Sequence, residues 1–293
     1  MTIIDGKQLS QSIKDEIKES VAQLKADGKN IPHLAAVLIG NNPASESYVR
    51  NKTRSCDYVG FESTLIRKDD SITEEELLDI VRELNENDDV DGFIVQLPLP
   101  KHIDEVKVTL AIDPKKDVDG FHPVNFGRMA QGLPCYLPAT PYGIVQMLDR
   151  YEIETSGKHV VVVGRSNIVG TPMSILLSRK AKVGNATVTL THSRTKDLTA
   201  ELLRADIIIA AIGIPEFISG DQIKEGAVII DVGINRVDDE TRKAGYRLVG
   251  DVEWDSVSPK ASFITPVPGG VGPMTVTSLL MNTLKASAKE IYG

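Results

Sequence analysis

The 293-residue sequence predicts an α/β protein of two domains, each built on a parallel sheet with helices on its faces. An uninterrupted run of four valines at residues 160–163 is typical of a strand buried on both faces. Apolar runs alternate with helical patterns in the first third of the chain and again after residue 159. Between them, residues 113–138 are rich in Gly, Pro and Asp, which indicates a functional loop or a domain crossover.

In the first half, apolar residues at helical spacing predict an opening helix that Gly28 closes: Leu9, Ile13, Ile17, Val21 and Leu24. Strands are expected at residues 33–39, 61–67 and 92–97, with a helix over residues 44–59 between the first two. Ser71 and Glu74 have the spacing of a capping box before the next helix. A short helix to about Ile112 precedes the irregular stretch.

In the second half, a helix beginning at Thr140–Pro141 is interpreted as the connector into the second domain. Strands are expected near residues 160, 187, 207 and 228, with helices between the first three. A final helix over residues 276–291 most economically crosses back onto the first domain. The expected domains are therefore residues 1–140 together with 275–293, and residues 141–274.

The composition excludes several classes of protein. A net charge of −8 argues against general nucleic-acid affinity, so an anionic ligand would need locally placed cations. The two cysteines, Cys56 and Cys135, show neither zinc spacing nor a disulfide framework, and no metal site is expected. The sequence has no apolar run of membrane length, no pattern of a signal peptide and no visible internal repeat, so a cytoplasmic enzyme is expected.

The segment Gly164–Pro172 follows the valine strand and has the features of an anion-binding turn. Two glycines bracket a polar turn, and Thr171–Pro172 predicts an N-cap followed by proline at the first helical position. Backbone N–H groups and the helix dipole at such a turn favour a phosphate. The spacing departs from G-x-G-x-x-G, because Arg165-Ser166-Asn167 stands where the middle glycine is usual, and glycines of this kind also serve turns without ligands.

The end of the next strand favours NADP over NAD. A fold that prefers NAD usually has an acidic residue there for the ribose hydroxyls. This chain instead has Thr191-His192-Ser193-Arg194-Thr195. With Arg165 nearby in the predicted fold, the result is a basic, hydroxyl-rich pocket suited to a 2′-phosphate.

A candidate acid/base lies in the helix after Gly40. Ser45, Tyr48 and Lys52 are spaced three and four apart and share one helix face, whereas Arg50 and Arg54 lie elsewhere on the helix. A lysine at the carboxyl side of a parallel strand lies where open α/β sheets bind ligands, and its pKa shifts readily when it is desolvated. The alternative is a solvated helix face.

Three further groups are candidates. Gln96 ends the strand at residues 92–97, either in a site or as a cap on the loop. Residues 115–122 hold two aspartates and His122: a carboxylate that recognises N–H groups of a heterocycle and a possible base, or an Asx-turn and a structural histidine. The glycines of residues 268–273 permit close backbone approach to a flat ligand, or serve a hinge.

Several long motifs in the same order resemble the bifunctional methylenetetrahydrofolate dehydrogenase/methenyltetrahydrofolate cyclohydrolase family along essentially the whole chain. These motifs are SESYVRNKTR (45–54), GFIVQLPLP (92–100), KDVDG (116–120), GRSNIVGTP (164–172) and TPVPGGVGPMT (265–275). Two departures concern fine tuning. Thr53–Arg54 stands where the family often has a second lysine, and Ala139 stands where a cysteine is common.

The resemblance implies an N-terminal α/β/α catalytic domain, onto which the C-terminal helix packs back, and a Rossmann-type NADP-binding domain. It implies that Lys52 is the general acid/base of the cyclohydrolase step, with Gln96 as its hydrogen-bond partner. Tyr48 would stack on the folate, Asp119 would recognise the pterin, and Leu97 would line the substrate site.

The resemblance also implies the cofactor contacts, which are Gly164, Arg165, Ser166, Ser193 and Ile234. Arg165 would be the partner of the 2′-phosphate, and the backbone of Pro268, Gly269 and Gly270 would border both ligands. The implied function is NADP-dependent oxidation of methylenetetrahydrofolate and hydrolysis of the methenyl product, by a homodimer of one-carbon metabolism that serves purine biosynthesis. The alternatives are a shikimate-type NADP-dependent dehydrogenase and a nucleotide-sensing module without turnover.

Overall fold

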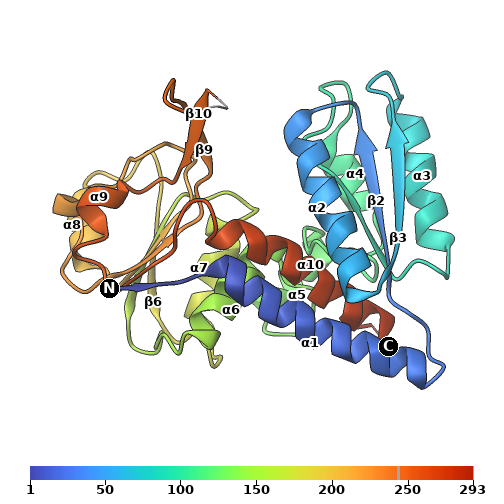
Figure 1. Cartoon of the computed structure of the whole chain (residues 1–293), viewed down its shortest axis with the longest axis horizontal. Helices are drawn as coiled ribbons and strands as arrows, with labels where there is room; N and C mark the ends of the chain where they lie inside the picture. The colour runs from blue at the N-terminus through green and yellow to red at the C-terminus, as the bar shows by residue number, and fades with distance from the viewer. Residues whose placement is uncertain (243–244, 293) are drawn as a thin grey trace. The chain divides into compact units, whose positions relative to one another are not determined.

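The computed structural model describes residues 1–242 and 245–292, and the chain divides into two compact units (Figure 1). One unit comprises residues 11–139 and 276–293, and the other comprises residues 1–10 and 140–275. The sequence assigned residues 1–10 to the first domain instead. They lie in the other unit because strand β1 (Thr2–Ile3) pairs in parallel with β11 (Phe263–Ile264).

The unit of residues 11–139 contains a parallel three-stranded sheet in the order β3-β2-β4. Its strands are β2 (His33–Ile39), β3 (Glu62–Lys68) and β4 (Gly92–Val95), which confirms the three expected strands to within two residues. The helices described are α1 (Gly6–Ala26), which starts in the other unit, α2 (Pro43–Val59), α3 (Glu74–Glu86), α4 (Glu105–Ala111), α5 (Pro123–Ala130) and α10 (Val271–Ser287), which ends here.

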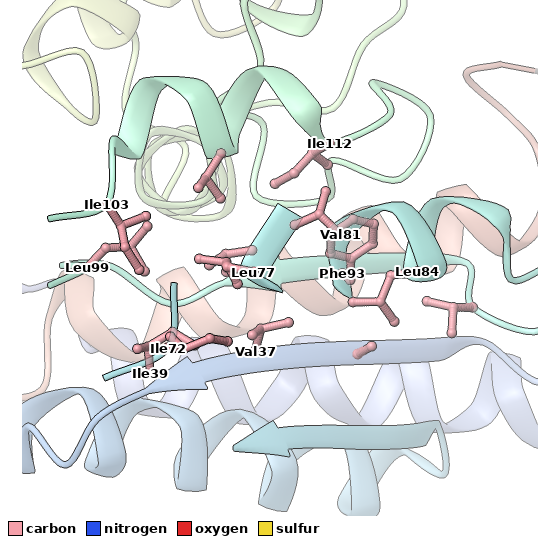
Figure 2. Packing of buried hydrophobic residues seen from close by; sticks show 14 residues of the cluster. Val37, Ile39, Ile72, Leu77, Val81, Leu84, Phe93, Leu99, Ile103 and Ile112 are labelled. Carbon is pink, nitrogen blue, oxygen red and sulfur yellow. The ribbon is translucent and has the colours of Figure 1, made fainter. Parts of the chain in front are cut away.

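Alternate residues of β2 build the core between the sheet and helices α3 and α4. Val37 and Ile39 of β2 and Phe93 of β4 face Leu77 and Val81 of α3 in one buried cluster (Figure 2). Leu34, Ala36 and Leu38 are also buried, so this strand is covered on both faces. The central strand of a parallel sheet is expected to be buried in this way.

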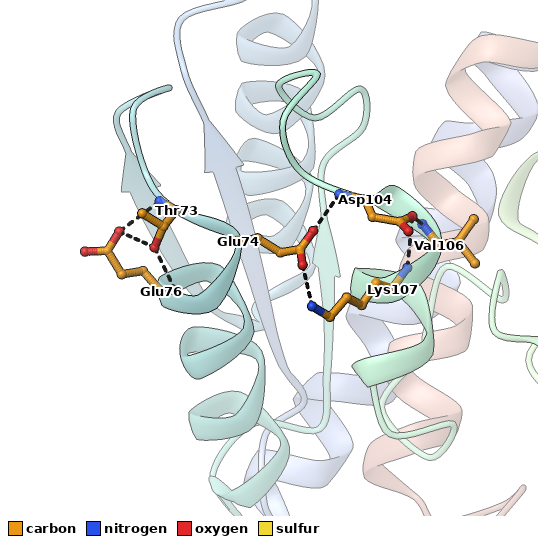
Figure 3. A network of polar contacts seen from close by, with 6 residues as sticks. All are labelled: Thr73, Glu74, Glu76, Asp104, Val106 and Lys107. Carbon is orange, nitrogen blue, oxygen red and sulfur yellow. Dashed lines mark hydrogen bonds and ion pairs between the residues drawn. The ribbon is translucent and has the colours of Figure 1, made fainter.

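The capping box of α3 lies two residues later than the sequence predicted. Thr73 is the N-cap, its Oγ1 accepts a hydrogen bond from the N–H of Glu76 (3.2 Å), and its own N–H donates to Glu76 Oε2 (2.8 Å) (Figure 3). Ser71 N–H instead donates to Asp69 Oδ1 (3.0 Å) in the preceding turn. Both Ser71 and Thr73 precede an acidic residue at the same spacing, so the motif alone does not distinguish them.

The stretch at residues 113–138 is not wholly irregular as expected, because it contains helix α5. His122 is its N-cap and Pro123 its first residue. The helix is short and its sequence, PVNFGRMA, contains residues of low helix propensity. Asn125 ties it to the rest of the unit: its Nδ2 donates to Asp117 Oδ2 (2.9 Å), and its Oδ1 accepts from the N–H of Tyr136 (3.3 Å) and the hydroxyl of Tyr292 (2.8 Å).

The second unit contains a six-stranded sheet in the order β1-β11-β8-β7-β5-β6, all paired in parallel. Four of its strands are β5 (His159–Val163), β6 (Thr187–Thr191), β7 (Ile207–Ala210) and β8 (Val228–Asp231), which confirms the four expected positions. Its helices include α6 (Ala139–Arg150), α7 (Gly170–Ser178), α8 (Leu198–Arg204), the 3₁₀ turn η1 (Gly220–Gln222) and α9 (Trp254–Val257).

An antiparallel hairpin that the sequence did not predict follows β8. Strands β9 (Asn235–Asp238) and β10 (Tyr246–Val249) pair with each other, and Figure 1 shows them apart from the main sheet of this unit. The strands are only four residues long, and Arg236 lies 3.9 Å over the ring of Tyr246. So short a hairpin needs support at its base.

At the amino end of the three-stranded sheet, hydrogen bonds of His33 link the three strands. Its ring Nε2 lies 2.9 Å from Thr64 Oγ1 on β3, and its backbone N–H donates to Asp91 Oδ2 (2.8 Å) just before β4. Both neighbouring strands are thereby tied to the start of the central one.

In the six-stranded sheet, His159 makes the same two kinds of hydrogen bond. Its Nε2 lies 2.9 Å from Thr189 Oγ1 on β6, and its N–H donates to Asp206 Oδ2 (2.7 Å) just before β7. The partners occupy the same register positions as in the other unit. These side-chain hydrogen bonds occupy the amino ends of both sheets. In open α/β sheets, ligands bind beyond the carboxyl ends of the strands, so we expect the sites there.

Candidate functional site

Lys52 of α2 is buried and bonded to a neutral partner. Lys52 is only 7% exposed, and its Nζ donates a hydrogen bond to Gln96 Oε1 (3.1 Å). Gln96 follows β4, and its Nε2 donates to the carbonyl of Leu97 (2.8 Å). That second bond fixes the orientation of the amide, so Gln96 presents its oxygen to the lysine.

The surroundings favour the neutral form of the lysine. Burial lowers the pKa of Lys52, and attraction to Asp119 opposes that shift. Burial likewise raises the pKa of Asp119, while Lys52 opposes it. Cys56, one turn further along α2, has its pKa raised to about 12 by burial and remains a thiol. A lysine whose hydrogen-bond partner is an amide releases a proton more readily than one paired to a carboxylate.

The face shared by Ser45, Tyr48 and Lys52 is not uniform. Ser45 is buried, like Lys52, whereas Tyr48 is 41% exposed. The interpretation as a wholly solvated face is therefore wrong for Lys52 and Ser45. The exposed ring of Tyr48 is accessible for stacking on a ligand.

The two aspartates of the KDVDG segment have different roles in the structure. Asp117 accepts hydrogen bonds from the N–H groups of Phe121 (3.2 Å) and His122 (2.8 Å) and from Asn125 Nδ2 (2.9 Å). It therefore forms the turn and anchors α5. Asp119 interacts electrostatically with Lys52, and within the described residues no hydrogen bond to its carboxylate is found.

His122 is structural rather than a base. Its Nδ1 accepts a hydrogen bond from the N–H of Val124 (3.1 Å), which caps α5, and burial lowers the pKa of its ring. Of the two interpretations from sequence, the hydrogen-bonded histidine is confirmed.

Leu97 and Asp119 line one small cavity of about 20 Å³, together with apolar side chains that include Ile112 and Phe121. A carboxylate at an apolar wall is desolvated, which explains the direction of the shift in the pKa of Asp119. The cavity brings Leu97, predicted from the resemblance, next to the candidate pterin-recognising group.

Asn282 of α10 was not predicted and holds the Asp119 segment in place. Its Nδ2 donates to the carbonyls of Val118 (2.8 Å) and Leu137 (2.9 Å), and the side chain is buried. The N–H of Ala139 in turn donates to the carbonyl of Asp119 (3.2 Å). An asparagine directly after the apolar run Leu279–Met281 is the signal in the sequence that could have indicated this role.

The turn after β5 needs both of its glycines. Gly164 has φ +109°, and a Cβ there would lie 2.2 Å from the carbonyl oxygen of Ala211. A Cβ at Gly170 would lie 1.9 Å from the carbonyl oxygen of Gly164. The backbone of this turn is therefore packed closely, as a phosphate-binding turn requires.

The predicted N-cap at Thr171 is wrong. Helix α7 begins at Gly170, and Val169 occupies the N-cap position without a capping side chain. Thr171 Oγ1 instead donates to the carbonyl of Arg165 (3.1 Å), and Ser166 Oγ accepts from the N–H of Val169 (3.2 Å). These hydroxyls close the turn, so the helix needs no separate cap.

The turns after β5 and β6 are neighbours. Val163 pairs with Thr191, and the N–H of Gly164 donates to the carbonyl of Thr191 (3.1 Å). Ser193 and Arg165 are both exposed beyond these strand ends. Within the described residues, no ion pair involves Arg165. An exposed guanidinium beside a tight glycine turn fits the phosphates of NADP.

The other predicted residues of this unit lie after β8 and β11. Ile234 is exposed, and a Cβ at Gly272 would lie 3.3 Å from its Cδ1. Gly269 has φ +109° and its carbonyl accepts from the N–H of Lys7 (2.9 Å). Pro268 is exposed and Gly270 is buried.

The described residues show neither a metal site nor a membrane-spanning helix. They contain no group of three or more His, Cys, Asp or Glu side chains placed to hold a metal ion. No helix among residues 1–242 and 245–292 is both long and apolar enough to cross a membrane.

Comparison with known proteins gives the family. The catalytic domain of tetrahydrofolate dehydrogenase/cyclohydrolase matches residues 4–119, and the NAD(P)-binding domain of the same family matches residues 138–291. The bifunctional protein FolD of Cytophaga hutchinsonii is 62% identical over 98% of this chain and 99% of its own length. That of Bacteroides fragilis is 61% identical over 100% of both chains.

Solved structures agree with this match. The bifunctional enzyme FolD of Campylobacter jejuni is 45% identical, with a TM-score of 0.93 and 99% of each chain covered. The Trypanosoma brucei enzyme, solved in complex with NADP cofactor and inhibitor, is 38% identical, with a TM-score of 0.93 over 100% of this chain and 99% of that one. The chain therefore belongs to the tetrahydrofolate dehydrogenase/cyclohydrolase family.

Proposed function

We propose that this protein oxidises 5,10-methylenetetrahydrofolate with NADP and hydrolyses the methenyl product to 10-formyltetrahydrofolate, with Lys52 as the general acid/base. The observation that carries the proposal is the buried Lys52 Nζ, bonded to the neutral Gln96 amide at 3.1 Å. A sensor without turnover has no need of such a buried lysine. Membership of the family and the full-length match to bifunctional relatives support both activities.

Lys52 suits each part of this chemistry. NADP, when bound, supplies the acceptor for the hydride that leaves the one-carbon bridge of the folate. The methenyl product is a cation, and a permanently charged neighbour would destabilise it, so a lysine with a lowered pKa is favourable. In hydrolysis, the neutral Nζ removes a proton from the attacking water as its oxygen bonds to the one-carbon unit. The resulting ammonium gives a proton to the ring nitrogen as the bond from that nitrogen to the one-carbon unit breaks, and the hydroxyl proton of the adduct is lost to solvent as the formyl carbonyl forms, so one proton is released per turnover.

The remaining folate contacts follow from the chemistry of each side chain. Asp119 has a carboxylate suited to accepting hydrogen bonds from the N–H groups of a pterin. Tyr48 has an exposed ring for stacking, and Leu97 lines the cavity beside Asp119. The backbone of residues 268–270 is proposed to border the ligands.

For NADP we propose the turn Gly164–Ser166, together with Ser193 and Ile234. The exposed Arg165 would bind the 2′-phosphate, because a guanidinium pairs with phosphate in a bidentate manner. The same reasoning predicts that substitution of Arg165 raises the KM for NADP more than the KM for NAD.

The test compares wild type with Lys52→Met, following NADPH formation and methenyl-folate hydrolysis separately. The expected result is loss of hydrolysis by the variant, while wild type performs both reactions. Lys29→Met is the control, because Lys29 belongs to the same unit and its side chain is 64% exposed. Normal hydrolysis by Lys52→Met would refute the role of the lysine, and absence of NADPH formation by wild type would refute the substrate.

We also propose that the protein acts as a homodimer in the cytoplasm. Strand β3 lies at the edge of its sheet, with Leu65 exposed, and such an edge can receive a second copy. Neither Cys56 nor Cys135 is part of a disulfide in the part of the chain that the structure describes, as expected of a reducing compartment. Light scattering of the purified protein tests the dimer, and a Leu65→Lys variant that stays dimeric would exclude this edge.

A further inference from the structure

Two buried aspartates lie at the carboxyl edge of the six-stranded sheet. Asp231 ends β8, and Asp251 follows β10, the returning strand of the hairpin. Their exposed fractions are 4% and 0%. Both belong to the unit that contains the candidate NADP site, and neither was predicted to have a function.

Asp251 joins the ends of two strands. Its Oδ2 accepts hydrogen bonds from the N–H groups of Ile212 (2.7 Å) and Gly213 (3.0 Å), which follow β7. Its Oδ1 accepts from Asn235 Nδ2 (2.9 Å), and Asn235 is the residue after Ile234. One carboxylate therefore sets the backbone beyond β7 and the start of the hairpin beyond β8.

Asp231 holds Asp251 in place. Its Oδ1 accepts from the N–H groups of Gly233 (2.9 Å) and Asp251 (2.9 Å), and its Oδ2 accepts from that of Val252 (3.0 Å). A Cβ at Gly250 would lie 1.8 Å from Asp231 Oδ2, so glycine is required where the hairpin returns. In each of these hydrogen bonds a carboxylate oxygen of Asp231 or Asp251 accepts from an N–H group. A carboxylate has two acceptor oxygens and no donor, which explains why aspartate occupies both positions.

This network lies at the point in the sheet where a dinucleotide is expected. Strand β5 has β6 on one side and β7 on the other, so the strand order changes direction at β5. Open α/β sheets bind ligands beyond the carboxyl ends of the strands at such a switch point. The turn at Gly164 contacts the end of β7, since a Cβ there would lie 2.2 Å from Ala211 O and 3.2 Å from Ile212 Cγ2. Asp251 fixes the backbone that follows.

We propose that Asp251, held by Asp231, is a positioning residue for NADP. It acts through the backbone of Ile212–Gly213 and of Ile234–Asn235 and makes no contact with the cofactor itself. The proposal rests on the proposed NADP site at this edge of the sheet. It confines the effect of Asp251 to the reaction that uses the dinucleotide, since hydrolysis of methenyl-folate needs none.

The experiment measures both activities of Asp251→Asn. The amide keeps the size of the side chain, but one of its two polar atoms becomes a donor that faces another donor. We expect the KM for NADP to rise roughly tenfold, as for the loss of a hydrogen bond to a charged group. The kcat of hydrolysis and the KM for methenyl-folate, measured without dinucleotide, should stay within about twofold of wild type.

Asp206→Asn is the matched control. Asp206 accepts from the backbone N–H of His159 (2.7 Å) at the amino end of the same sheet, so its substitution also removes an acceptor from a strand end. The KM of the Asp206→Asn variant for NADP should equal that of wild type. If Asp251→Asn does not fold, Asn235→Ala is used instead. It removes the side-chain donor to Asp251 Oδ1 and to the carbonyl of Gly250 (3.2 Å), leaves the bonds of Asp251 to Ile212 and Gly213, and should raise the KM for NADP by a smaller factor.

Two results overturn the inference: an unchanged KM for NADP in whichever of these variants folds, or an equal loss of both activities. Arg165→Ala separates this failure from failure of the proposed site. If Arg165→Ala raises the KM for NADP while the Asp251 and Asn235 variants do not, only the positioning role is wrong. If Arg165→Ala also has no effect, the proposed cofactor site itself is wrong.

Discussion

At the scale of single residues, burial decides which of several similar side chains can take part in chemistry. The chain contains many lysines, but Lys52 combines burial with a neutral hydrogen-bond partner, Gln96. The sequence placed Lys52 on a helix and Gln96 at a strand end, from their spacing and neighbours. That their side chains meet at 3.1 Å is a result of packing.

Replacing Gln96 with glutamate should shift the pH dependence of hydrolysis. A carboxylate beside Nζ favours the ammonium form and therefore raises the pKa of Lys52. The base is the neutral amine, so the acidic limb of the kcat profile should move to higher pH. Gln96→Met adds no charge and serves as the control. A profile of Gln96→Glu that coincides with that of Gln96→Met would contradict the role of Lys52.

The two aspartates of the KDVDG segment should respond in opposite ways to the same substitution. Asp117→Asn loses an acceptor for bonded N–H groups, so the free energy of unfolding should fall by about 1–3 kcal/mol. Asp119→Asn should change the free energy of unfolding by no more than about 1 kcal/mol from wild type. It should raise the KM for folate, because the Asp119 carboxylate is proposed to bind substrate. Urea titration and steady-state kinetics on both variants test this, and the reverse pattern would exchange their roles.

At the scale of elements, the sequence predicted regular segments well and their ends poorly. Strands β2 and β5 follow from uninterrupted apolar runs. The predicted N-caps of α3 and α7 were wrong. Ser71 and Thr73 have the same local sequence pattern, so the pattern cannot distinguish them, and the hydroxyl of Thr171 donates to the carbonyl of Arg165 instead of capping α7. Helix α5 and the β9–β10 hairpin were missed, since hydrogen bonds to distant residues support them rather than a periodic pattern.

Removal of the Asn282 side chain should impair the Asp119 segment. Asn282→Ala leaves the carbonyls of Val118 and Leu137 without their donor, so the segment that presents Asp119 loosens. We expect the KM for folate to rise about tenfold in both reactions, with the dissociation constant of NADP unchanged. Thr283→Val is the control on the same helix, because the hydrogen bond that Thr283 Oγ1 makes, to the carbonyl of Leu279 (2.9 Å), lies within α10. An unchanged KM for folate in Asn282→Ala would exclude the role of Asn282.

At the scale of the whole molecule, each unit contains a buried carboxyl whose burial costs stability when it ionises. Burial raises the pKa of Asp117 in one unit and of Asp231 in the other to about 7, from a usual value of 3.8. Between these two pKa values the folded protein binds more protons than the unfolded chain. The contribution of these two carboxyls to stability therefore falls as pH rises from about 4 to 7 and levels off above that.

Asn substitutions at Asp117 and Asp231 test this linkage. Each variant lacks the titrating group, so wild type should lose stability relative to the variant as pH rises from 5 to 7. Urea unfolding across that range provides the measurement. A difference between wild type and variant that does not change with pH would show that the carboxyl is already ionised at pH 5.

The amino-acid sequence by itself determined the α/β class, the positions of the main strands and the motifs that indicate a folate- and NADP-dependent enzyme. These depend on periodicity and on residues close together in the chain. Only the tertiary structure assigned residues 1–10 to the second unit, distinguished Asp117 from Asp119, and revealed Asn282 and the Asp231–Asp251 pair. Each of these depends on hydrogen bonds between residues far apart in sequence or on desolvation, and neither is encoded in local spacing.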